Sequence, residues 1–144
     1  MWAPPRAASP RSRWWPRAFV GVAALVTAGL VALLVHDTGA VRHGGRAIEF
    51  PVPRGSVKID GGPDRVSYLM LGYPDLKGAF DARGAEHGWQ FCGQFGAGYS
   101  FGPTGPNLGL HLGATTELKT SFFTRVNFFV REDPAAGHPG ACGR

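Results

Sequence analysis

The sequence predicts an α+β protein with one N-terminal transmembrane helix, followed by a small antiparallel sheet with one packed helix. The first reason is an uncharged run of 18 residues, Ala18–Val35, behind a basic leader. The second is helical spacing of apolar residues in Leu76–His87, between segments that have the apolar pattern of strands. The third is a set of 13 aromatic residues between positions 47 and 133, which is enough to form a core.

The run Ala18–Val35 is interpreted as a signal anchor. At about 1.5 Å per residue it spans roughly 27 Å, close to the ~30 Å hydrocarbon core of a bilayer. Trp14 and Trp15 lie where an interfacial aromatic belt is expected, and the arginines of the leader keep that end in the cytoplasm. We therefore expect a single-pass protein of the cell membrane with an extracytoplasmic C-terminal domain. The alternative is a signal peptide cleaved after Ala40, which would release a secreted ligand-binding protein.

Most of the net charge of +5 belongs to the leader. Met1–Arg17 carries four arginines and no acid, so the other 127 residues hold 11 basic and 10 acidic side chains. A nucleic-acid-binding domain needs a basic patch of its own, and this near-neutral domain is therefore not expected to bind nucleic acid. Each basic residue near an anionic membrane surface contributes about 1 kcal/mol of attraction, which again favours the bilayer as the partner of the leader.

Cys92 and Cys142 are the two cysteines of the chain, and we predict that they form a disulfide. Exported domains keep disulfides because their compartment is oxidising. Closing a loop of this length stabilises a domain by roughly 4 kcal/mol in the chain-entropy model. The spacing gives no support to a zinc finger or a redox site, and the five histidines are dispersed along the chain. We expect no metal and no cofactor.

The first part of the domain is predicted to contain strands separated by turns. Glycine, proline and aspartate gather in one cluster, which indicates a turn, and apolar runs on both sides of it have the length of strands. The predicted segments are a polar linker at 36–46, strands at Ile48–Val52 and Ser56–Ile59, a turn at Asp60–Asp64 and a strand at Val66–Gly72.

One helix is predicted at Leu76–His87. Asp75 precedes it and can accept hydrogen bonds from its first amides. Leu76, Ala79 and Phe80 share one face by their spacing, and Gly88 is a plausible C-terminal stop. Its glycines each cost ~1 kcal/mol relative to alanine, so we expect this helix to depend on tertiary packing.

The second part of the domain is predicted to return to strands. Trp89–Phe95 alternates aromatic and polar residues, which directs Cys92 away from the aromatic core and leaves it within reach of the tail. The remaining predicted segments are a glycine- and proline-rich loop at Gly96–Gly109, a sheet-edge pairing at Leu108–Leu112, a long strand at Ser121–Arg131 and a flexible tail at 134–144.

The long strand carries the candidate binding residues. Its alternation predicts that Phe122, Thr124, Val126, Phe128 and Val130 face the core. The other face then combines aromatic and basic side chains, a surface that could dock a membrane-proximal envelope protein or polymer. The alternative is that the helix or the glycine-rich loop covers this face, because large apolar side chains are usually buried. The candidate binding residues are Phe123, Arg125, Phe129 and Arg131.

The segment Gly98–Gly102 matches G-x-S-x-G, the pattern of a serine nucleophile elbow. The elbow needs a helix after the serine, but two prolines follow at Pro103 and Pro106, where they cannot begin a regular helix. No acid lies between Ser100 and His111, so the Ser–acid–His order fails for that histidine. We therefore predict no catalytic site, and we keep a small exported serine hydrolase as an alternative that Ser100→Ala would test.

The sequence thus predicts a membrane-anchored protein that is not an enzyme. The leader 1–17 is expected in the cytoplasm, the helix 18–35 in the bilayer and the domain 47–133 outside, where it acts as a binding or accessory module. The expected partners are the bilayer, through Ala18–Val35, and an envelope protein or polymer close to the membrane.

Overall fold

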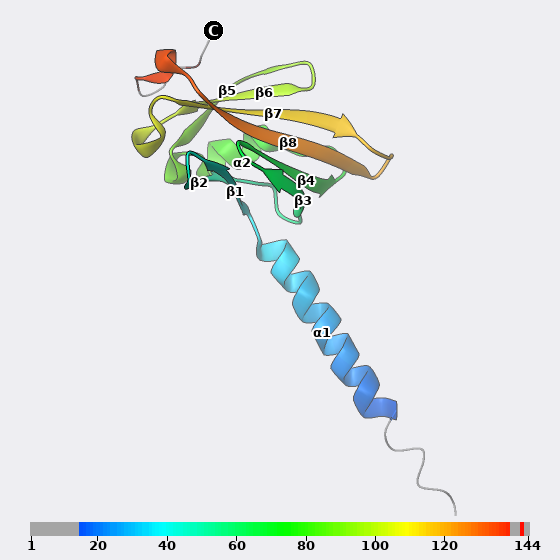
Figure 1. Ribbon diagram of the computed structural model, residues 1–144. Helices are drawn as coiled ribbons and strands as arrows, with labels where there is room; N and C mark the ends of the chain where they lie inside the picture. Colours follow the sequence, from blue (N-terminus) through cyan, green and yellow to red (C-terminus); the bar gives the residue numbers. More distant parts are fainter. Residues whose placement is uncertain (1–14, 139–141, 143–144) are drawn as a thin grey trace, which may run out of the picture. The chain divides into compact units, whose positions relative to one another are not determined.

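The computed structural model describes residues 15–138 and 142, with side chains described for 19–32, 36–138 and 142. The chain divides after Ala32 into two compact units, and each is described by itself. The first unit holds most of helix α1, Trp15–Val35, which runs from blue to cyan in Figure 1. The second unit contains the strands and helix α2.

Helix α1 exposes apolar side chains along its length. The side chains described for it, at 19–32, carry no charge, and none of them is buried. Within the described part of the chain, no helix meets the length and hydropathy expected of a membrane span. The predicted leader 1–17 lies mostly outside the described residues. The large apolar residues of α1 that are at least 53% exposed are Phe19, Val20, Val22, Leu25, Val26, Leu30 and Val31.

The second unit is built mainly from antiparallel strands. A two-stranded hairpin is followed by a six-stranded sheet with the order β3-β4-β8-β7-β6-β5, in which every neighbouring pair is antiparallel. The antiparallel sheet predicted from the sequence is confirmed. The strands are β1 Thr38–His43, β2 Arg46–Pro51, β3 Val57–Gly62, β4 Arg65–Leu71, β5 Trp89–Phe95, β6 Gly98–Pro103, β7 Leu110–Leu118 and β8 Phe123–Glu132.

Helix α2, Leu76–Arg83, begins where the sequence predicts and ends earlier. The Gly78 amide donates to the Asp75 carboxylate over 2.8 Å, which is the predicted N-cap. The helix ends at Gly84, whose carbonyl accepts from the Trp89 amide over 2.8 Å. A Cβ on Gly84 would lie 2.5 Å from the carbonyl oxygens of Phe80 and Trp89, so this close crossing requires glycine.

The core lies between one face of the six-stranded sheet and a layer made by α2 and the hairpin (Figure 1). From α2, the Phe80 ring stacks on Phe101 of β6 with centroids 3.7 Å apart. From β2, the Phe50 ring contacts Phe128 of β8 at 4.5 Å. Because Phe101 and Phe128 point to the same side of the sheet, α2 and the hairpin cover one face. We call the opposite side the outer face.

The segment predicted as a linker, 36–46, contains strand β1 instead. Arg83 of α2 donates to the Asp37 carbonyl over 2.6 Å and pairs with the Asp37 carboxylate. Hydrogen bonding from Arg83 lowers the pKa of Asp37. Val41 is buried in the core, so the folded part begins before the predicted boundary at Ala47. The polar, glycine-containing composition of 36–46 predicts a linker, although this segment forms one strand of a hairpin.

The predicted loop at Gly96–Gly109 and the predicted edge pairing at Leu108–Leu112 are also wrong. Strand β6 forms inside the loop, because Tyr99 and Phe101 alternate with small residues and are buried in the core. Strand β7 then lies between β6 and β8 rather than at an edge. Phe122, predicted to face the core, is 71% exposed because it precedes the first residue of β8.

The tail predicted as flexible is ordered where it is described. Pro134–Ala136 forms a 3-10 turn, and Ala136 is 1% exposed. Its carbonyl accepts from the Gly109 amide over 2.9 Å, which attaches the tail beside the start of β7. Residues 139–141 and 143–144 lie outside the described residues.

Candidate functional site

The outer face brings the predicted binding residues onto one surface. Antiparallel pairing places Phe123, Arg125, Phe129 and Arg131 at alternate positions of β8, and side chains two residues apart share a face. On β4 their cross-strand neighbours are Leu71, Leu69 and Arg65, and on β7 they are Glu117, Gly113 and His111. The face therefore combines the aromatic, basic and acidic side chains of three strands.

Arg125 lies at the centre of a polar cluster on this face. Its Nε donates to the Asn127 side-chain oxygen over 2.9 Å, and its Nη2 donates to the Ser67 hydroxyl over 3.1 Å. The Ser67 hydroxyl donates in turn to Asn127 over 2.8 Å. This network holds the guanidinium plane in one orientation and uses one Nε and one Nη2 donor, so an external acceptor would meet the donors that remain on Nη1 and Nη2.

A cavity of about 360 Å³ opens at the cluster. Asp60 approaches Arg125 at 3.7 Å, and Glu117 pairs with Lys119, whose hydrogen bond lowers the pKa of Glu117. The site therefore offers both hydrogen-bond donors and ionised acceptors. The residues lining the cavity are Asp60, Arg65, Ser67, Glu117, Arg125 and Asn127.

The two aromatic side chains of the predicted surface lie in different surroundings. Phe123 is 41% exposed. The ring of Phe129 lies over Gly113, where an added Cβ would be 2.3 Å from the ring Cζ. An aromatic ring covering a cross-strand glycine shields the backbone of the sheet. Phe123 is therefore the aromatic side chain available to a partner, and Phe129 supports the surface.

The structure joins Ser100 and His111, a pair for which the sequence order argued against catalysis. Pairing of β6 with β7 brings the Ser100 hydroxyl within 2.9 Å of His111 Nε2. His111 is 6% exposed, and burial, helped by the charge of Arg131, lowers the pKa of the imidazole. A neutral imidazole can accept a proton from a serine hydroxyl.

The pair lacks the other parts of a serine hydrolase site. His111 Nδ1 is buried without a hydrogen-bond partner among the described residues, whereas a triad uses an acid there to orient the ring. Ser100 lies inside a regular strand rather than on the strained turn of a nucleophile elbow. Predicting this pair from the sequence requires recognising that 98–103 and 110–118 are paired strands. The glycines in these segments favour a loop instead.

The predicted disulfide is present. Cys92 and Cys142 are bonded, with a Cα–Cα distance of 5.3 Å and a sequence separation of 50. The bond attaches the C-terminal segment to the edge strand β5, whose ladder is interrupted by a register shift between Phe91 and Gly93. It therefore holds together two segments that are far apart in the sequence.

Comparisons with known proteins add no relative: no protein-family model, no curated protein and no solved structure matches this chain. Among the described residues, no three His, Cys, Asp or Glu side chains come close enough together to hold a metal ion.

Proposed function

We propose that this chain is a single-pass, membrane-anchored protein whose extracytoplasmic domain is a binding or accessory module for a partner close to the membrane. The exposed apolar side chains of α1 support the anchor, because a helix that is apolar all round requires apolar surroundings. The arginine-rich leader supports the orientation. The disulfide supports an oxidising compartment for the domain.

The binding surface of the proposal is the outer face around Arg125. The observation that carries it is a guanidinium held by Ser67 and Asn127 inside a cavity, with the exposed ring of Phe123 on the same strand. Aromatic and arginine side chains supply most of the binding free energy in protein interfaces. The mixture of donors and carboxylates fits a polar segment of an envelope protein or polymer that carries both acceptors and donors.

The anchor is tested by the intact mass of the native protein recovered separately from the membrane and from the medium. We expect the full-length chain in the membrane fraction, about 2 Da lighter before reduction than after it because of the disulfide. A truncated species in the medium, beginning near Val41, would replace the anchor with a cleaved signal peptide.

The binding surface is tested by a photo-reactive amino acid introduced at position 123, with position 95 as the control. Phe95 is 82% exposed on the edge strand β5, so both positions accept the probe without disturbing the core. We expect partner adducts from position 123 in intact membranes and their loss in Arg125→Gln. Equal labelling from both positions, or adducts that survive Arg125→Gln, would contradict the proposed surface.

A serine hydrolase is the second candidate, favoured by the 2.9 Å contact between Ser100 and His111. A fluorophosphonate probe reacts with activated serines, and Ser100→Ala provides the background. We expect no labelling above that background, because no acid orients His111 among the described residues. Labelling that depends on Ser100 would mean that the module is an enzyme.

A further inference from the structure

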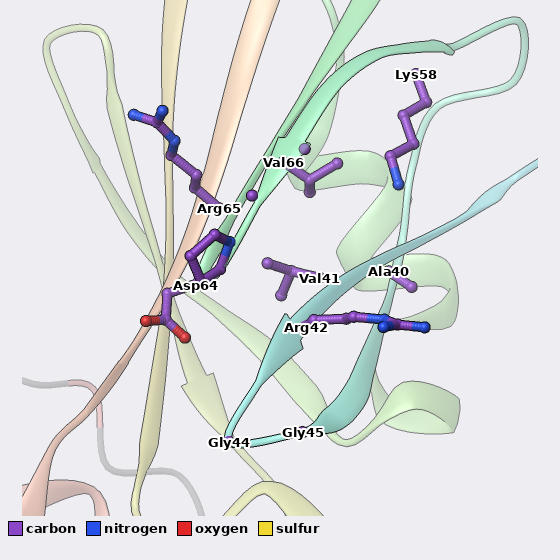
Figure 2. A pocket seen from close by; sticks show the side chains of 12 residues that line it. Ala40, Val41, Arg42, Gly44, Gly45, Lys58, Asp64, Arg65 and Val66 are labelled. Atoms are coloured by element: carbon purple, nitrogen blue, oxygen red, sulfur yellow. The ribbon is translucent and has the colours of Figure 1, made fainter.

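A second cavity, of about 650 Å³, lies between the β1–β2 hairpin and the turn that joins β3 to β4 (Figure 2). Its volume falls within the ~300–1,000 Å³ range of small-molecule sites. Ala40 and Pro63 are the partly or fully exposed apolar residues of its wall, whereas Val41 and Val66, which also line it, are both 2% exposed. Gly44 and Gly45 form the hairpin turn at its border with positive φ angles, and an added Cβ on either would meet open space.

The charged side chains that line this cavity are mostly cationic. Arg42, Lys58 and Arg65 line it, and none of them has a salt bridge to an acid among the described residues. Asp64, the acid in the lining, pairs with His43 at 2.7 Å. In the view of Figure 2, the Arg42 and Lys58 side chains lie to the right, and the Asp64 carboxylate and the Arg65 guanidinium lie to the left.

The strand pairing places the exposed residue Lys58 on the side of β3 that borders the cavity. Lys58 lies opposite Tyr68 of β4, and Gly61 lies opposite Val66, so both are at positions that face the core side. At these two positions the chain has a lysine and a glycine instead of apolar side chains that would extend the core. The Lys58 ammonium lies over Gly61, where an added Cβ would be 3.4 Å from Lys58 Nζ. The Asp64 amide donates to the Arg42 carbonyl over 2.8 Å. This hydrogen bond joins strand β1 to the turn between β3 and β4, on the two sides of the cavity.

We propose that this cavity binds an anionic phosphate ester, with Arg42 and Lys58 contacting the phosphate oxygens and the apolar surface at Ala40 and Pro63 contacting the carbon skeleton. Unpaired cations attract phosphate strongly because charge-assisted hydrogen bonds are about twice as strong as neutral ones. The volume and the apolar wall favour an ester over the free anion.

The anchor of the proposed function, on which this step rests, makes an anionic phospholipid headgroup the nearest source of such a group. Ala40 in the cavity wall follows Val35, the last residue of α1, by five positions. Five extended residues span at most about 18 Å, so the chain keeps Ala40 within that distance of the last residue of the proposed anchor.

The experiment first measures binding of glycerol 1-phosphate to the full-length protein in an uncharged detergent, by calorimetry. We expect saturable binding that weakens with salt and becomes about tenfold weaker in Arg42→Gln and in Lys58→Gln. Lys58→Arg keeps the charge and should retain binding. Arg46→Gln is the matched control, because Arg46 follows the same turn but does not line this cavity.

Because this step needs no bilayer, it separates failure of the site from failure of the anchor. No binding of glycerol 1-phosphate, or equal binding by wild type and Lys58→Gln, would overturn the site. If Lys58→Gln instead forms oligomers with unchanged affinity, the lysine only protects an edge strand, and the site is overturned as well.

The second step identifies the source of the phosphate group. The full-length protein is reconstituted in vesicles of phosphatidylcholine alone or with phosphatidylglycerol. Protection of Lys58 from amine-reactive labelling only in the anionic vesicles would support the lipid headgroup. Equal labelling in both vesicles, after glycerol 1-phosphate binding has been observed, would overturn the lipid source and assign the site to a soluble ester.

Discussion

Gly113→Ala offers the sharpest test of how the outer face is packed. A Cβ at this position would lie 2.3, 2.5 and 3.0 Å from three atoms of the Phe129 ring, whereas carbon atoms in contact lie about 3.5–4.0 Å apart. The ring must therefore move by about 1 Å or more. Alanine is normally favoured over glycine inside a strand by roughly 0.5–1 kcal/mol, so the propensity and the packing predict opposite signs for this substitution.

We expect packing to prevail, because overpacking typically costs about 1–3 kcal/mol. Gly113→Ala should lower the free energy of unfolding by about 1–2 kcal/mol in the wild-type background. In a Phe129→Ala background the clash disappears, and the same substitution should become neutral or stabilising by about 0.5 kcal/mol. The coupling energy of the double-mutant cycle is then about 2 kcal/mol.

The assay is equilibrium urea unfolding of the full-length protein, followed by near-ultraviolet circular dichroism. Gly93→Ala is the control, since its Cβ would meet the Phe95 ring at 3.5 Å, an ordinary contact; it should be neutral or stabilise the fold by about 0.5–1 kcal/mol. An equal cost of Gly113→Ala with and without the Phe129 ring would refute the packing argument.

Three further predictions concern the disulfide, the buried histidine and the helix cap. Replacing Cys92 and Cys142 by serine should lower the free energy of unfolding by about 4 kcal/mol, measured by urea unfolding. An unchanged urea midpoint would show that the disulfide does not stabilise the fold. Burial lowers the pKa of His111 in the folded state, so the unfolded state takes up a proton at a higher pH than the folded state does. The free energy of unfolding should therefore be highest above about pH 6.5 and should fall as the pH drops toward the folded-state pKa. His111→Gln should remove that part of the pH dependence, and identical profiles for variant and wild type would contradict it. Asp75→Ala should lower the free energy of unfolding by about 1 kcal/mol, because the Gly78 amide loses its acceptor, and Asp75→Asn, which keeps an acceptor, should retain most of that stability in the same urea unfolding experiment.

Local signals account for the elements that the sequence predicts well. Strand β5 has the predicted bounds, Trp89–Phe95, because its alternation and the left-handed Gly88 before it are both encoded within a few residues. The start of α2 follows from the Asp75 cap. On β8 the predicted core positions Thr124, Val126 and Phe128 are buried, since a strand with one covered face has a period of two.

The errors have a common cause, which is that pairing between distant segments overrides local composition. Glycines and prolines predicted a loop over β6, yet Phe101 is held by stacking on Phe80 and by the ladder with β7. The order of residues argues against a Ser–acid–His triad at Ser100 and His111 but says nothing of their contact, which follows from the register of β6 and β7. Strand propensity is weak compared with such tertiary contacts.

The sequence by itself determined an antiparallel fold around one capped helix, the buried positions of β8 and the only disulfide that two cysteines can form. Tertiary structure alone decided which face of the sheet is covered, where Arg125 meets Ser67 and Asn127, and that Phe129 rests on Gly113. The physical reason is that alternation along a strand distinguishes two faces but contains no information about what packs against each. That information lies in contacts between residues far apart in the chain.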